Sequence, residues 1–111
     1  MIATYQQPGS AIDYPNGTST SSAIAAGQVV SLTTRIGVAG TDIPASAVGS
    51  LYVKGVFAMP KATSTAIAIG AAVYYDASAD NITTTAASNI PAGWAIAAAA
   101  KSDTTVQVCI G

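Results

Sequence analysis

The sequence predicts an all-β fold, a small β-sandwich or β-barrel of short, mostly antiparallel strands with an extended N-terminal arm. Apolar and polar residues alternate over short runs, and turn dipeptides separate these runs at intervals of about eight to twelve residues. No stretch has the pattern of a long helix. The short connections are of hairpin length, which favours antiparallel pairing. We expect about seven to nine strands in total.

Residues 1–22 form the expected N-terminal arm with short strands. Pro8-Gly9 and Asn16-Gly17 are turn dipeptides that limit this segment to two short strands. Tyr5, Ile12 and Tyr14 are the side chains with which it can contact its own domain or a neighbour. The remaining residues, 23–111, are of a size typical of a single β domain.

A short pattern occurs twice in this domain. It begins at Ala23 and again at Ala66, and in both copies an Ile, a Gly and a Val follow at the same spacing. Ile43-Pro44-Ala45 recurs later as Ile90-Pro91-Ala92. The offset between these two copies is four residues longer than the offset between Ala23 and Ala66. These matches predict two pseudo-repeats, residues 23–65 and 66–111. Chance similarity in an Ala-rich chain is the alternative.

The alternation of apolar residues predicts strands in the first half of the domain. Residues 29–36 read as one half-buried strand. Asp42 to Val48 has a capping residue and a proline suited to a single helical turn. Residues 49–59 show the clearest alternation, with Gly55 in the interior predicting a bulge or a close backbone approach.

Three further elements are expected in the second half. Residues 73–76 and 82–85 flank a polar five-residue connection and predict a hairpin. Residues 93–100 place Trp94, Ile96 and Ala98 on one face of a strand. The chain ends on a strand in which Val106, Val108 and Ile110 face one way.

The composition predicts a protein that associates. Only 8% of the residues are charged, against roughly 25% in ordinary domains. Half of the residues are apolar, so the surface has little like-charge repulsion to keep copies apart. We therefore expect an oligomer or a lattice-bound component rather than a monomer. The net charge of −1 and the scattered basic residues argue against nucleic-acid binding, and no apolar run approaches the length of a membrane span.

The sequence predicts no enzyme, no metal site and no cofactor. It contains no His and no Glu, which excludes a Ser-His-Asp triad, a Cys-His pair and a His-based metal site within one chain. Asp76 and Asp80 resemble part of a calcium loop but lack its other oxygen ligands, so a solvated turn is preferred. No phosphate-binding loop occurs.

The expected place of synthesis is a reducing cytoplasm. The N-terminal residues lack the basic and apolar regions of a signal peptide. The single cysteine, Cys109, has no intrachain partner, and its place in an apolar alternation predicts a buried thiol.

Several short motifs together resemble a family of small tailed-phage and prophage proteins. They keep the same order over nearly the full length: Tyr5-Gln6-Gln7-Pro8-Gly9, Ile12-Asp13-Tyr14, Ala26-Gly27-Gln28-Val29-Val30, Gly55-Val56-Phe57-Ala58-Met59-Pro60-Lys61, Gly70-Ala71-Ala72-Val73-Tyr74-Tyr75-Asp76 and Ile82-Thr83-Thr84-Thr85. Ala71 and Ala72 depart from the polar or acidic residues common in relatives. This departure affects the expected surface more than the expected fold.

The resemblance implies capsid decoration by a β-rich cement protein on the outer surface of the virion. The implied partners are the major capsid protein and further copies of the chain, commonly in a homotrimer. The candidate capsid or subunit contacts are Ile2, Tyr5, Gln7, Pro8, Tyr14 and Tyr52. The family is also often labelled a RecA/RadA-type recombinase, but the missing nucleotide-binding loop contradicts that label.

A virion-surface module that binds host glycans through exposed Tyr and Thr side chains is the alternative function. Exposed aromatic side chains can stack on sugars, although such side chains more often pack across strands or fill interfaces. Glycan binding by the isolated protein would favour this alternative, and binding only to expanded capsids would favour the cement function.

Overall fold

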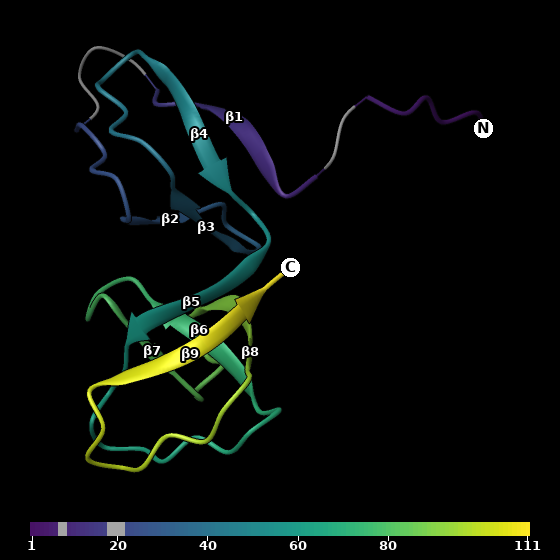
Figure 1. Cartoon of the computed structure of the whole chain (residues 1–111). Helices are drawn as coiled ribbons and strands as arrows, with labels where there is room; N and C mark the ends of the chain where they lie inside the picture. The colour runs from purple at the N-terminus through teal and green to yellow at the C-terminus, as the bar shows by residue number, and fades with distance from the viewer. Residues whose placement is uncertain (7–8, 18–21) are drawn as a thin grey trace.

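The computed structural model describes residues 1–6, 9–17 and 22–111, and these residues form two antiparallel sheets without a helix (Figure 1). The upper sheet in Figure 1 has the order β1-β4-β3-β2 and the lower sheet the order β5-β9-β8-β6-β7. The upper strands are β1 (Ala11–Pro15), β2 (Val29–Ser31), β3 (Ile36–Ala39) and β4 (Val48–Tyr52). The lower strands are β5 (Gly55–Pro60), β6 (Ala72–Asp76), β7 (Asn81–Thr83), β8 (Ile90–Ala95) and β9 (Thr105–Ile110). The all-β prediction is confirmed.

The two sheets share one topology. In each, the first strand lies at an edge and pairs with the last strand, which is followed by the third and the second. In the lower sheet β7 is an additional strand, paired to the outside of β6. The chain therefore forms the same four-stranded arrangement twice.

Hydrogen bonds before β2 and before β6 match as well. Ile24 forms an isolated antiparallel bridge with Ile43, and Ile67 forms one with Ala99. Gly27 N donates to Ala39 O at 2.7 Å, and Gly70 N donates to Ala95 O at the same distance. Both glycines have φ above +80°, a conformation that glycine adopts without a Cβ penalty. In the structure, Ala99 is therefore the counterpart of Ile43. Ile90, which the sequence pattern matched to Ile43, lies in β8 opposite Tyr75 of β6.

The matched positions form the centres of two hydrophobic cores. All are buried, and the pairs follow directly from the strand registers. They are Ile24 with Ile67, Val30 with Val73, Ala39 with Ala95, Ile43 with Ala99, and Leu51 with Val108. The repeat boundaries expected from the sequence, 23–65 and 66–111, remain a proposal.

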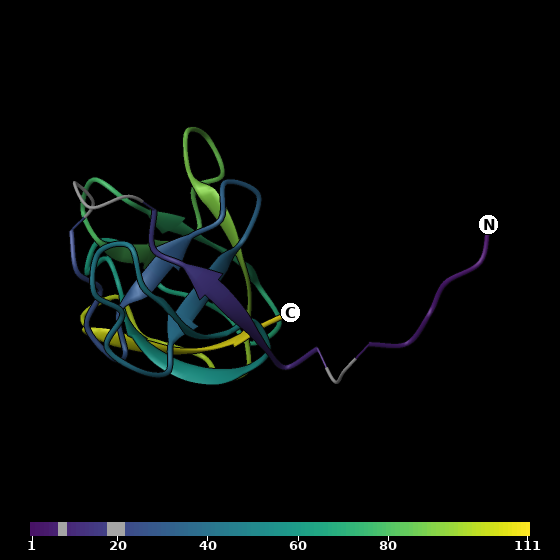
Figure 2. The same cartoon turned by 90° about the horizontal axis from the view of Figure 1, so that it is seen from above.

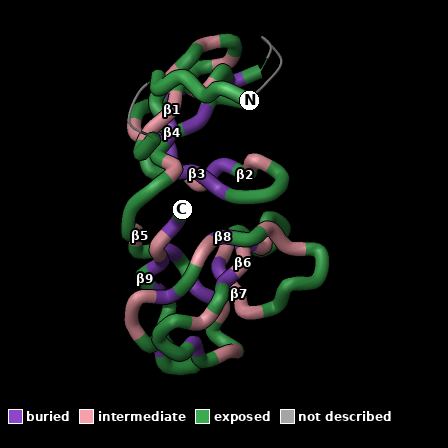
Figure 3. The backbone as a smooth tube through the Cα atoms, turned by 90° about the vertical axis from the view of Figure 1, so that its right-hand side faces the viewer, coloured by how far each residue is buried: buried purple, intermediate pink, exposed green. Residues whose placement is uncertain are grey.

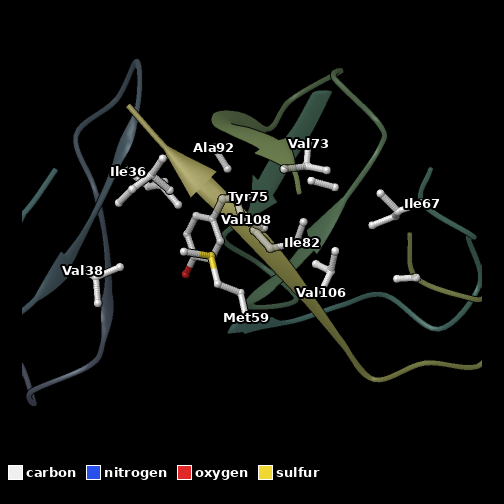
Figure 4. Packing of buried hydrophobic residues seen from close by; sticks show 13 residues of the cluster. Ile36, Val38, Met59, Ile67, Val73, Tyr75, Ile82, Ala92, Val106 and Val108 are labelled. Atoms are coloured by element: carbon white, nitrogen blue, oxygen red, sulfur yellow. The ribbon is translucent and has the colours of Figure 1, made fainter. Parts of the chain in front are cut away.

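The upper sheet packs on the lower one through β3. All four residues of this strand are buried, and Figure 3 shows the strand at mid-height in the molecule. Its Ala39 belongs to the upper core, whereas Ile36 and Val38 join the lower core and point toward Met59 and Tyr75 (Figure 4). One strand therefore contributes to both cores.

The lower sheet curls until its two edges meet. Lys61, directly after β5, forms a parallel bridge with Ile82 of β7. Ala62 N donates to Ile82 O at 2.9 Å. The lower sheet is thus a small, nearly closed barrel, an arrangement that covers sheet edges.

The prediction of one strand over residues 29–36 is wrong. The chain turns after β2, where Thr33 has φ of 73° and Leu32 N donates to Arg35 O at 2.8 Å. After this turn the chain forms β3, which begins at Ile36. Residues 42–48 contain no helical turn, because Ile43 takes part in its bridge and Ser46 adopts a positive φ.

The strand expected over residues 49–59 is divided between the two sheets. β4 ends at Tyr52 and β5 begins at Gly55, whose φ of 125° redirects the chain. Leu51 and Met59 are both buried as the alternation indicated, but in different cores. Gly55 is therefore the point where the chain leaves the upper sheet.

The hairpin and the C-terminal strand are confirmed. β6 pairs with β7 across the predicted polar connection. Val106, Val108 and Ile110 are buried along β9. The strand expected over 93–100 lies earlier in the chain, at Ile90–Ala95, and exposes Trp94.

The N-terminal residues differ from the strand that follows them. β1 is an integral edge strand of the upper sheet, paired to β4 over five residues. Residues 1–6 project away from both sheets (Figure 2). Among the described residues there is no helix with the length and hydropathy needed to cross a membrane.

Candidate interaction surfaces

The projecting N-terminal segment carries two of the predicted contact residues. Ile2 is 95% exposed and Tyr5 is 79% exposed. Gln7 and Pro8, also predicted as contacts, lie outside the described residues. The side chains of residues 1–6 carry no charge, so the segment presents apolar groups that the described part of its own chain leaves in solvent.

The other two predicted residues lie at opposite ends of the β1–β4 pair. Tyr14 is half-buried against the upper core, and its Cα partner on β4 is Gly49. Tyr52 is 43% exposed and lies opposite Ala11. The structure therefore places Tyr14 and Tyr52 apart along the β1–β4 pair.

Tyr52 borders an apolar groove between the two sheets. Its ring centroid lies 6.2 Å from that of Phe57, and it passes so close to Gly40 that a Cβ there would lie 2.8 Å from the ring. The groove has a volume of about 400 Å³ and no charged side chain in its lining, which consists of Gly27, Val29, Val38, Ala39, Gly40, Tyr52, Phe57, Ala58, Met59 and Pro60. Such a groove suits an uncharged ligand surface.

A second apolar surface, which the sequence did not indicate, lies on the outside of the lower sheet. Val56, Cys109, Trp94 and Ala72 are Cα partners in succession across β5, β9, β8 and β6, and we call them the outer row. Val56 is 50% exposed and Trp94 is 46% exposed. Cys109 is half-buried here, rather than fully buried as predicted. The alternation of Val106, Val108 and Ile110 was the signal that places Cys109 outward.

One basic side chain is buried. Lys61 is 4% exposed, and its Nζ donates to the carbonyl oxygens of Ala62, Lys101 and Asp103 at 2.6, 3.2 and 3.2 Å. These bonds tie the end of β5 to the loop that precedes β9. Because backbone carbonyls hold the ammonium group in place, Lys61 has a structural role.

The two aspartates of the β6–β7 connection support a turn. Asp76 Oδ1 accepts hydrogen bonds from Ser78 N, Ser78 Oγ and Ala79 N, which lower the pKa of the Asp76 carboxyl. Tyr75 OH donates to Asp80 Oδ1 at 2.6 Å, and burial together with this bond raises the pKa of Tyr75 to about 12. No group of three acidic, His or Cys side chains that could hold a metal occurs in the described ranges.

Comparison with known proteins identifies the family. The family model described as phage cement protein matches residues 6–110. The chain belongs to the phage cement protein family. Searches of curated proteins and of solved structures each gave no match. Family membership gives this chain a structural role in association with the phage capsid, as a component of the virion, and families of this kind are not normally enzymes.

Proposed function

We propose that this cement protein binds major capsid protein subunits on the outer surface of the phage head and stabilises the assembled shell. The observation that carries the proposal is the match to the phage cement family over residues 6–110. A surface with few charges and two uncharged apolar regions, the groove and the outer row, supports a role in adhesion. Synthesis in the host cytoplasm, assembly as a homotrimer and the absence of catalysis are parts of the same proposal.

Stabilisation follows from binding to the assembled lattice alone. A ligand that binds one state of an equilibrium stabilises it by RT ln(1 + [L]/Kd), about 2.7 kcal/mol per site at a hundredfold excess over Kd. A shell offers many such sites, and an oligomeric cement protein can bind several subunits at once. Modest contacts at each site thus add up to a large resistance to internal pressure.

The N-terminal segment supplies part of the capsid contact in this proposal. Ile2 and Tyr5 are exposed apolar side chains on an extended backbone. An extended segment can add to the edge of a neighbouring sheet, where backbone hydrogen bonds give affinity and side-chain pockets give specificity. Gln7 and Pro8, which follow this segment in the sequence, belong to the same proposed contact.

The test is reconstitution on capsids that lack the protein. Purified full-length chain and a variant lacking residues 1–9 are added separately to expanded capsids, and occupancy is measured by gel densitometry and imaging. We expect saturable binding of the full-length chain, higher resistance of the shell to heating, and a clear loss of occupancy for the shortened variant.

The controls distinguish the parts of this proposal. The circular dichroism spectra of both chains should agree, because β1 and all later strands are retained in the variant. Equal occupancy of the two chains would refute the role of the N-terminal segment. Failure of the full-length chain to bind capsids would refute the cement function itself, and glycan binding by the isolated chain would favour the alternative of host recognition.

A further inference from the structure

The outer row has a structural counterpart in the upper sheet. Ala11, Tyr52, Val38 and Val29 are Cα partners in succession across β1, β4, β3 and β2, and we call them the upper row. The outer row crosses β5, β9, β8 and β6 in the same way. Since the two sheets share one topology and matched core positions, the two rows lie on equivalent faces.

Within the chain, the part of the upper row on β3 and β2 is covered, whereas Tyr52 on β4 borders the groove and is 43% exposed. Val38 is only 6% exposed and packs in the lower core together with Met59 and Tyr75 (Figure 4). Val29 is half-buried against the same cluster. The upper row thus packs on one end of the lower sheet, at Met59 and Tyr75. This contact within the chain shows how a row of this kind can be covered.

The outer row is not covered by the described part of the chain. Trp94, the only tryptophan, is 46% exposed, and Val56 beyond Cys109 is 50% exposed. The row contains no acidic or basic side chain. An exposed aromatic and aliphatic surface of this kind is typical of the centre of a protein interface.

The upper sheet carries counterparts of the two residues that cover the upper row. Ile12 on β1 and Phe57 on β5 are equivalent, because their partners on β4 and β9 are matched core positions. Tyr14 lies two residues after Ile12 and Met59 two residues after Phe57, so Tyr14 corresponds to Met59. Leu32 follows Val30 by two residues, as Tyr75 follows Val73. Tyr14 and Leu32 are half-buried against the upper core, and we call them the counter-surface.

We infer that the outer row of one copy docks on the counter-surface of a second copy of this chain. The contact between copies repeats the one that already joins the upper row to Met59 and Tyr75 within a single chain. It deepens the self-association part of the proposed function and rests on it. Because the two surfaces differ, the contact is heterologous, and it forms a closed ring such as a trimer when the rotation between copies closes.

The test uses two variants that each destroy one surface. Trp94→Lys places a charge in the outer row, and Tyr14→Lys places one in the counter-surface. Each change is expected to weaken self-association by about 30-fold or more, measured by sedimentation of the full-length chain. Ile69→Lys is the matched control, since Ile69 is 68% exposed outside both surfaces, and it should assemble as the wild type does.

Mixing the two variants separates head-to-tail docking from face-to-face docking. Tyr14→Lys keeps an intact outer row and Trp94→Lys keeps an intact counter-surface, so an equimolar mixture should form heterodimers. Trp94 is then present only in the Tyr14→Lys chain, and its emission should shift to the blue when the partner is added. If circular dichroism shows that Trp94→Lys does not fold, Val56→Lys replaces it in the outer row. Leu32→Lys replaces Tyr14→Lys in the counter-surface in the same way.

Each outcome decides the matter. Wild-type assembly, weakened single variants and restored dimers in the mixture would support the inference. A monomeric wild type, folded variants that assemble as well as the wild type, or a mixture that stays monomeric would each overturn it. A chain that assembles through these surfaces but never occupies capsids would contradict the proposed function and leave this inference standing.

Discussion

At the scale of single residues, Lys61 shows how a charged side chain can be buried without an acidic partner. Three backbone carbonyls accept its hydrogen bonds, and bonds to a charged donor are stronger than those between neutral groups. No pattern in the sequence indicates this burial, because a Lys after the strand-ending Pro60 is normally in solvent. The three carbonyl acceptors belong to residues 62, 101 and 103, which only the fold brings together.

Replacing Lys61 with Met tests this role. The substitution keeps the apolar stem but leaves three carbonyls without their donor, and we expect a loss of about 2 kcal/mol in the free energy of unfolding. Lys101→Met, at an exposed side chain, should change it by less than about 0.5 kcal/mol. Urea unfolding followed by Trp94 fluorescence measures both values. Equal midpoints for the two variants would show that the Lys61 ammonium group does not contribute.

At the scale of elements, β8 depends on an irregularity at Gly93. The register between β6 and β8 shifts between Val73 and Tyr74, and Gly93 adopts φ of 129°. A methyl group at Gly93 would overlap the carbonyl oxygen of Cys109. This glycine therefore lets the backbone of β9 approach β8 closely.

The matched comparison is Gly93→Ala against Gly70→Ala. Gly70 also has a positive φ, of 81°, but open space where a Cβ would lie. We expect Gly70→Ala to cost about 1 kcal/mol from backbone strain, and Gly93→Ala to cost about 3 kcal/mol because overlap is added to strain. Thermal unfolding followed by circular dichroism shows which of the two variants loses more stability. A smaller effect at Gly93 would contradict the close approach of the strands.

The elements also show what alternation can and cannot predict. It identified β9 and the β6–β7 hairpin, where one face is buried along the whole strand. It failed over residues 29–36, because the turn uses Thr33 at positive φ and no Gly or Pro marks it. It also joined β4 to β5, since Leu51 and Met59 keep the period while they enter different cores.

For the interaction surfaces, the sequence predicts association through an uncharged surface, but its period-two patterns do not place that surface on the fold. Low charge indicated association, and Ile2 and Tyr5 are indeed exposed. The alternation places Trp94 in one strand with Ile96 and Ala98, but β8 ends at Ala95, so these two residues follow the strand. The groove beside Tyr52 depends on the packing of one sheet on the other, which is a property of residues far apart in sequence.

At the scale of the whole molecule, the two cores differ in their dependence on each other. Among the described residues, the upper core has five buried hydrophobic side chains and the lower core thirteen, two of which come from the upper sheet. A unit with so few buried side chains is marginal alone, because little apolar surface offsets its loss of conformational entropy. The upper sheet therefore relies on β3 and its contact with the lower core.

Ile36→Ala tests this dependence. Ile36 is 2% exposed and reaches from β3 into the lower core, so its truncation should cost about 2–5 kcal/mol. The loss should fall on the upper sheet, because the lower barrel keeps its remaining core while the upper sheet loses its support. In native-state hydrogen exchange, the amide of Leu51 should exchange much faster than in the wild type while that of Val108 changes little.

Val106→Ala, within the lower core, should instead accelerate both amides, since the upper sheet unfolds whenever its support does. Equal acceleration of the two amides by Ile36→Ala would mean that the sheets unfold as one unit and that their stabilities cannot be separated.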